Sequence, residues 1–210
     1  MRNTSINRVI KGLIADGIYA SRATLGHHAS RRASGRILMY HSVEETLTDN
    51  DTMGLAVPVS TFAMHLQCVR GHGFRVISLS SLVESIRQKR ETPERSLVMT
   101  FDDGYQGVAR HALPLLKTFG FPATVFVNVS CIERTLPQHG YWHEWPTLTW
   151  NEIRALTGSG ISIGSHGVTH ERLTRMAREQ LLREIVESKE IIERHTVQPV
   201  HHFCYPHGSF

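Results

Sequence analysis

The sequence predicts an α/β domain built on a parallel sheet that helices cover, either as an open sheet or as a closed barrel. Three observations predict this fold. From Arg36 onward, short apolar runs rich in β-forming residues alternate with segments of helical periodicity. The strand runs are largely apolar and do not alternate with polar residues, which is typical of strands buried on both faces of a sheet. Polar residues follow the ends of several strands, at the edge where the loops of a parallel fold converge on one pocket.

Residues 1–35 are predicted to form a basic amphipathic leader and linker. Apolar side chains between Ile6 and Ile18 recur at helical spacing, and residues 1–36 carry seven basic side chains against one acidic side chain. We expect a short helix that either caps the domain or contacts a membrane surface or a partner. The rest of the chain has a net charge of −2, which argues against a body that binds nucleic acid through a basic face.

Residues 36–210 are predicted to form one domain with a single core. Strands are expected over residues 37–40, 75–78, 97–101, 124–127, 161–163 and 203–205. Helices are expected over residues 59–72, 79–88, 107–119, 149–157 and 172–194. The last helix has the clearest pattern, because six apolar side chains face one way: Leu173, Met176, Leu181, Ile185, Ile191 and Ile192.

Composition narrows the class of protein further. No apolar run reaches the length of about 18 residues that a membrane-spanning helix needs. The N-terminus lacks a secretion signal, so we expect cytoplasmic residence, with contact to the inner membrane face through residues 1–35 left open. Three widely spaced cysteines indicate neither a disulfide framework nor a thiolate zinc site.

Two adjacent carboxylates, Asp102 and Asp103, end the apolar run in MTFDDGY. Consecutive side chains of an extended chain point to opposite faces, so the two cannot do the same job there. One interpretation is that one carboxylate binds a metal while the other stays free as a base. The alternative is that one caps the helix beginning near Tyr105 and the other is solvated.

Histidines also follow strand ends, with His41 after the first strand and His166 after ISIGS. His166 and His170 are four residues apart in SHGVTH, a spacing that lets two imidazoles meet on one metal. His139 and His143 share this spacing, but they lie in a loop, where we expect ordinary loop residues or a substrate rim. Two histidines and one carboxylate with open positions form a known catalytic site for zinc, iron or another divalent ion.

The segment HHFCYPHG predicts a fixed turn at the edge of the same pocket, because proline and glycine follow Tyr205. An exposed backbone N–H at this turn is a candidate donor to an oxyanion. The alternative is a plain turn with a stacked tyrosine ring.

Taken together, these segments resemble the polysaccharide deacetylase family (NodB homology domain, carbohydrate esterase family 4). The resemblance covers residues 36–210 and rests on ILMYHSV, VMTFDDGY, GFPATVFV, LTWNEI, IGSHGVTH, LLREIVESKEIIER and FCYPHG, in the family's order. It implies a distorted (β/α)7 barrel with Asp102 as catalytic base. It further implies Asp103, His166 and His170 as ligands of a divalent metal, with Zn²⁺ expected and Co²⁺ an alternative, and the Tyr205 backbone N–H as an oxyanion donor.

The chain departs from the family pattern at two points. An arginine that orients the base in other members is missing from the third motif. The sequence also stops at Phe210, before the family's last strand and helix and its late Leu-x-x-His, which supplies the general acid. We therefore expect a barrel truncated before its last strand and helix. We do not expect His201, His202 or His207 to replace the missing acid.

The leading functional hypothesis is a metal-dependent hydrolase that removes N-acetyl groups from a chitin-like glycan, an exopolysaccharide or peptidoglycan. The alternative is a catalytically inactive remnant that binds a metal and a glycan without turnover. A third hypothesis is a related hydrolase that cleaves C–N bonds in small cyclic amides.

Overall fold

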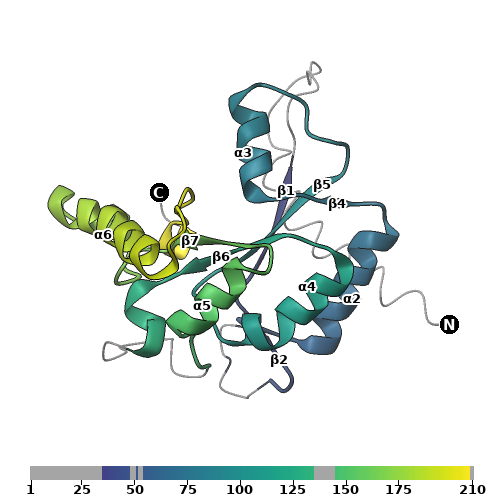
Figure 1. Cartoon of the computed structure of the whole chain (residues 1–210), viewed down its shortest axis with the longest axis horizontal. Helices are drawn as coiled ribbons and strands as arrows, with labels where there is room; N and C mark the ends of the chain where they lie inside the picture. Colours follow the sequence, from purple (N-terminus) through teal and green to yellow (C-terminus); the bar gives the residue numbers. More distant parts are fainter. Residues whose placement is uncertain (1–34, 48–50, 52–53, 135–144, 209–210) are drawn as a thin grey trace. The chain divides into compact units, whose positions relative to one another are not determined.

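A computed structural model describes residues 35–47, 51, 54–134 and 145–208 of the chain (Figure 1). The chain divides into two compact units, residues 1–32 and 33–210, and the first lies outside the described residues. The predicted helix between Ile6 and Ile18, its membrane contact, and His139 and His143 therefore also lie outside them. Among the described helices, none combines the length and the apolar character that crossing a bilayer requires.

Five parallel strands form the main sheet. They are β1 (Arg36–Tyr40), β4 (Arg75–Val76), β5 (Ser96–Phe101), β6 (Ala123–Val127) and β7 (Ile161–Ser165). Strand β5 is central, with β1 along one edge and with β4 and β6 beside the start and the end of the other edge. Strand β7 follows β6 in parallel register. Every residue of β5 and β6 is buried, as their continuous apolar patterns predicted.

The described strands form an open sheet, in which no pairing joins the outer strands β1 and β7. The α/β fold is thus as predicted, whereas the closed barrel is not seen in this part of the chain. The strand expected over residues 203–205 is reduced to a single parallel bridge between Ser165 and Phe203. Pro206 follows and offers no N–H for a longer ladder, so the chain turns at Pro206–Gly208 instead.

Two short parallel strands, β2 (Ser42–Glu44) and β3 (Ala56–Pro58), form a separate small sheet that the sequence did not predict. With three residues each, they are too short to show a periodic pattern.

The helices lie close to their expected positions. They are α2 (Val59–Gly71), α3 (Leu79–Arg87), α4 (Leu113–Phe119), α5 (Trp150–Thr157) and α6 (Arg178–Thr196). Figure 1 shows α2, α4 and α5 below the strands and α3 above them, while α6 packs against α5 and β7. The segment expected as one helix over 107–119 begins with a π-helical stretch, Val108–Ala112, before α4. A separate 3-10 turn, Leu173–Arg175, precedes α6.

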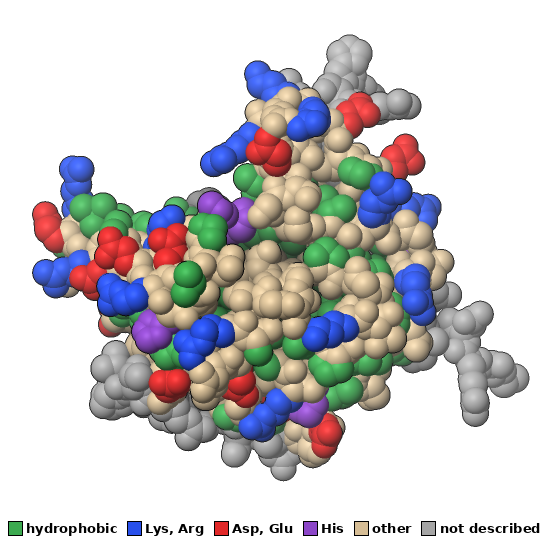
Figure 2. Space-filling model, viewed as in Figure 1, with side chains coloured by type: hydrophobic (Ala, Val, Ile, Leu, Met, Phe, Trp, Pro, Cys, Tyr) green, Lys and Arg blue, Asp and Glu red, His purple; other side chains and the backbone are tan. Residues whose placement is uncertain are grey.

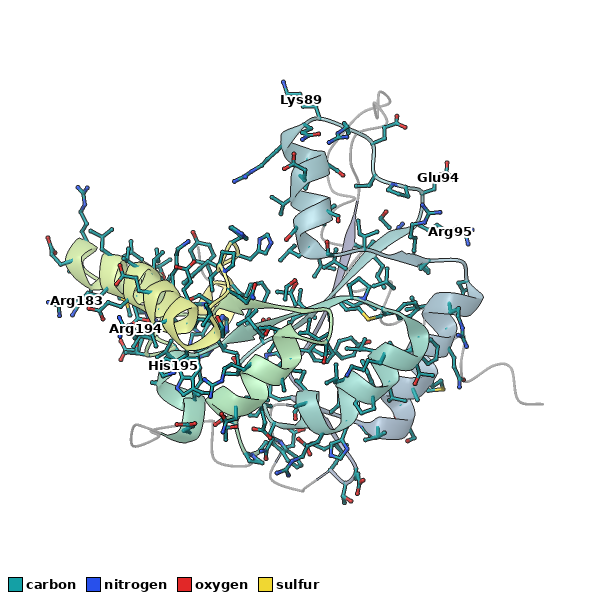
Figure 3. All side chains as sticks on the ribbon, viewed as in Figure 1. Lys89, Glu94, Arg95, Arg183, Arg194 and His195 are labelled. Carbon is teal, nitrogen blue, oxygen red and sulfur yellow. The ribbon has the colours of Figure 1, made fainter. Side chains whose placement is uncertain are left out.

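The buried face of α6 shares only Ile192 with the predicted apolar stripe. Its buried residues are Glu184, Ser188, Ile192 and Thr196, of which three are polar. Three side chains of the predicted stripe, Leu181, Ile185 and Ile191, are only half-buried. Labelled side chains Arg183 and Arg194 of α6 point outward (Figure 3). The inward face of α6 thus carries hydrogen-bonding groups toward the strand end that holds His166.

Candidate active site

The two adjacent aspartates are separated by a turn at the end of β5. The Asp102 N–H still donates to the Tyr40 carbonyl at 2.8 Å, so Asp102 keeps the strand register. Asp103 and Gly104 both have φ of +75°, in the left-handed region. The chain therefore leaves the sheet between the two carboxylates, and each side chain enters a different environment.

His166 is held at the end of β7 from two sides. Its N–H donates to the Val127 carbonyl at 2.9 Å, which continues the pairing of β7 with β6. Its Nδ1 lies 2.9 Å from the Cys204 carbonyl oxygen. Because a carbonyl only accepts, Nδ1 carries the proton of this hydrogen bond. In the neutral imidazole, the lone pair is then on Nε2, which faces Asp103.

Three atoms suited to metal binding converge at this point: Asp103 Oδ1, His166 Nε2 and His170 Nε2. Oδ1 lies 3.3 Å from the first nitrogen and 3.2 Å from the second, and the two nitrogens are 3.2 Å apart. Zinc–ligand bonds of about 2.0–2.1 Å in a tetrahedral site place ligand atoms about 3.3 Å apart. Oδ1 forms no well-shaped hydrogen bond despite these neighbours. The three residues therefore suit a divalent cation.

The pKa values of the three residues in this cluster are shifted by burial and by their contacts with one another. Burial raises the pKa of Asp103, but its contacts with His166 and His170 outweigh burial and lower the pKa below the ordinary value. Burial lowers the pKa of His166, but Asp103 and the Cys204 side chain raise it to about 10. Burial lowers the pKa of His170. Without metal, the raised pKa of His166 favours its protonated form beside the Asp103 carboxylate at neutral pH.

Asp102 lies beside this cluster in a different environment. It is 7% exposed, and its Oδ2 accepts a long hydrogen bond from the Cys204 thiol at 3.5 Å. Its Oδ1 has no hydrogen-bond partner among the described residues. Burial raises the pKa of Asp102, against the opposing influence of His166. A carboxylate whose pKa is raised in this way is suited to accepting a proton.

Asp102, His166 and Cys204 form a second group within ligand reach of one another. Because His166 Nδ1 is engaged by the Cys204 carbonyl, its Nε2 is the nitrogen free to bind a metal, and Nε2 lies 3.3 Å from Asp103 Oδ1 and 3.2 Å from His170 Nε2. The trio of Asp103, His166 and His170 is therefore the better metal site.

His41 is the site residue to which the sequence assigned no role. Its Nε2 lies 3.8 Å from Asp103 Oδ2, and its side chain is 24% exposed. It approaches the carboxylate through the oxygen that does not face His166 and His170. The available signal was its position directly after the first strand in ILMYHSV, on the same sheet edge as the aspartates.

Tyr205, His207 and His202 of the segment HHFCYPHG each make contacts of their own. The Tyr205 ring is 43% exposed and packs edge-on against Phe203. The oxyanion role of its backbone N–H stays a prediction. His207 Nε2 lies 3.1 Å from the His170 carbonyl, and His202 Nε2 bonds to Ser80 Oγ at 2.8 Å, at the start of α3.

The model of the polysaccharide deacetylase family matches residues 89–210, more than half of the chain. This chain belongs to the polysaccharide deacetylase family. The match includes MTFDDGY, SHGVTH and HHFCYPHG, which together carry the aspartates, the histidine pair and Cys204.

Two relatives are similar to this deacetylase-family chain in sequence, and one solved structure is similar to it in fold. YxkH of Bacillus subtilis (strain 168), which its name places with the polysaccharide deacetylases, is 28% identical over 174 residues, covering 83% of this chain and 57% of YxkH. Poly-β-1,6-N-acetyl-D-glucosamine N-deacetylase of Escherichia coli (strain K12) is 31% identical over 86 residues, covering 41% of this chain and 12% of that enzyme. The chain thus spans less than two thirds of each relative. The deacetylase PplD of Streptococcus pyogenes, solved in complex with acetate, shares the fold with a TM-score of 0.72 at 22% identity, over 85% of this chain and 75% of PplD.

Proposed function

We propose that this chain is a metal-dependent deacetylase that removes N-acetyl groups from an N-acetylglucosamine polymer. The observation that carries the proposal is the convergence of Asp103, His166 and His170 within 3.2–3.3 Å of one another, beside the buried carboxylate of Asp102. We also propose that the complete architecture is the distorted (β/α)7 barrel of the family.

Asp103, His166 and His170 would hold the divalent ion. One oxygen and two imidazole nitrogens suit Zn²⁺ or Co²⁺, and three protein ligands leave a position open for water or substrate. The part-buried hydrogen bond from His166 Nδ1 to the Cys204 carbonyl orients the imidazole toward the ion. When bound, the ion supplies Lewis-acid polarisation of the acetyl carbonyl and lowers the pKa of water.

The remaining groups handle protons. Asp102 accepts a proton from the water whose oxygen attacks the acetyl carbon. The tetrahedral intermediate then collapses as the C–N bond breaks. His41, on the other side of Asp103 and open to solvent, donates a proton to the departing nitrogen. The products are acetate and the free amine of the sugar.

The substrate class follows from the relatives. The Escherichia coli relative acts, by its name, on poly-β-1,6-N-acetyl-D-glucosamine. This supports a linear exopolysaccharide of N-acetylglucosamine ahead of chitin-like chains or peptidoglycan.

The test is acetate release from β-1,6-linked N-acetylglucosamine oligomers, with Zn²⁺ or Co²⁺ added to the metal-free protein. We expect metal-dependent release that Asp102→Asn lowers by at least about 100-fold, the lower range for losing a general base. Glu91→Gln makes the same carboxylate-to-amide change at an exposed position and is the matched control. Full activity of Asp102→Asn would exclude the proposed base, and metal binding without turnover would favour the inactive alternative.

A further inference from the structure

The loop between the two histidines of the site has an unusual backbone. Gly167 has φ of +83° and His170 has φ of +63°, both in the left-handed region. Between them, the backbone N–H groups of Val168 and Thr169 form no strand or helix hydrogen bonds, so they need other partners. The position of His170 therefore depends on whatever binds these N–H groups.

Glu184 of α6 supplies that partner. Its Oε2 accepts from the Val168 N–H at 2.6 Å and from the Thr169 N–H at 3.0 Å, and its Oε1 accepts from Thr169 Oγ1 at 2.7 Å. The carboxylate is 5% exposed. Burying a carboxylate is costly unless donors surround it, and here the loop provides all three.

The same helix holds the start of the loop through a second contact. The Gly167 N–H donates to Ser165 Oγ at 3.1 Å, and Ser165 Oγ lies 2.6 Å from Ser188 Oγ, one turn after Glu184. A Cβ at Gly167 would lie 2.8 Å from Glu184 Oε2, so the carboxylate packs directly against the backbone. Helix α6 thus binds the N–H groups of Val168 and Thr169 directly through Glu184. It holds the N–H group of Gly167 indirectly, through the contact between Ser188 and Ser165.

We propose that Glu184 is a positioning residue that sets the metal affinity of the site by holding the loop that carries His170. This inference rests on the metal site proposed above. Glu184 touches neither the ligand atoms nor the reacting atoms. It acts through the backbone of Val168 and Thr169, and it makes the placement of His170 relative to His166 independent of the metal.

The experiment measures Co²⁺ binding to the metal-free protein through the visible absorption of the bound ion. We expect Glu184→Ala to weaken binding about 10–100-fold, the usual loss for groups that orient ligands. We expect Glu184→Gln, which has the same length and keeps one acceptor for the backbone N–H groups, to lose less. Glu187→Ala removes an exposed carboxylate one turn along α6 and should bind like the wild type. Far-UV circular dichroism and thermal unfolding of the metal-free variants establish that each is folded.

Thr169→Val removes one hydrogen bond to Glu184 without changing any charge, so it extends the test if the alanine variant does not fold. We expect weaker Co²⁺ binding by this variant. Equal losses in Glu184→Ala and Glu184→Gln, with none in Thr169→Val, would trace the effect to charge and overturn the inference. Wild-type affinity in all three variants would overturn it and leave the proposed function standing. Absence of Co²⁺ binding by the wild-type protein would overturn both.

Discussion

Replacing His41 by glutamine tests the proton donor, the part of the site that the sequence did not assign. Glutamine has a similar reach but cannot donate a proton to a leaving amine at neutral pH. His41 Nε2 approaches Asp103 through Oδ2 at 3.8 Å, whereas His166 and His170 face Oδ1. The substitution should therefore remove the donor and leave the three ligand atoms in place.

The expected loss follows from this separation of roles. A positioned general acid typically contributes about 10²–10⁴-fold to the rate. At 1.36 kcal/mol per factor of ten, that range corresponds to about 3–5 kcal/mol of transition-state free energy. Because His41 is not one of the three ligands, we expect the loss in kcat, with Co²⁺ affinity close to that of the wild type.

The assay compares two substrates that differ in the leaving group. Acetate release from N-acetylglucosamine oligomers requires a proton on the departing nitrogen. Hydrolysis of 4-nitrophenyl acetate does not, since 4-nitrophenolate leaves without one. We expect His41→Gln to lose most activity on the amide and little on the ester. His72→Gln, the same change at an exposed position of the chain, is the matched control.

Two outcomes would refute this reasoning. Equal losses on the amide and the ester would mean that His41 acts before the leaving group departs. A large loss of Co²⁺ affinity would mean that it acts as a ligand, despite its position beyond Oδ2.

Two further predictions concern the base and the metal. Cys204→Ala removes the thiol that burial keeps protonated beside Asp102. We expect kcat to fall about tenfold, the cost of one lost hydrogen bond to a charged group. Cys204→Ser keeps a donor and should retain most activity, so an equal loss in both variants would contradict a hydrogen-bonding role. Because the pKa of His166 is raised to about 10 without metal, metal binding at pH 7 should release about one proton. Calorimetric titrations in buffers of different ionisation enthalpy measure this number, and binding heats that do not depend on the buffer would contradict it.

The centre of the sheet was predictable because strands β5 and β6 are largely apolar, whereas the outer strand β1 is also apolar but exposes Ile37 and Met39. Strands β5 and β6 are buried throughout, and that burial is visible in the sequence as continuous apolar runs. The polar residues after these strands predicted the edge of the sheet at which the candidate site lies, because the carboxyl ends of parallel strands meet at the same edge. The small β2–β3 sheet was not predictable, because three-residue strands are defined by their partner and not by a pattern of their own.

The residues of the candidate site could be named from the sequence, but their arrangement could not. The resemblance named Asp102, Asp103, His166 and His170, and the structure brings the last three together. His41 was visible at a strand end, yet only the pairing of β1 with β5 shows that it lies beside Asp103. A sequence pattern predicts at which edge of the sheet a residue lies. Which residues are its neighbours on that edge depends on the order of the strands in the sheet.

Glu184 shows where pattern reasoning fails for a physical reason. Positions 184, 188 and 192 follow one another at helical spacing, so they form one buried face of α6. Apolar periodicity correctly places Ile192 on the buried face, but it also places Leu181, Ile185 and Ile191 there, because it assumes that burial is driven by apolar surface. At this face, the loop between the histidines offers unpaired N–H groups, and a carboxylate that accepts them is more stable there than a leucine, which would leave them unsatisfied. A charged residue at an inward position of a helix is therefore a signal in itself, and it indicates a backbone segment that cannot satisfy its own hydrogen bonds.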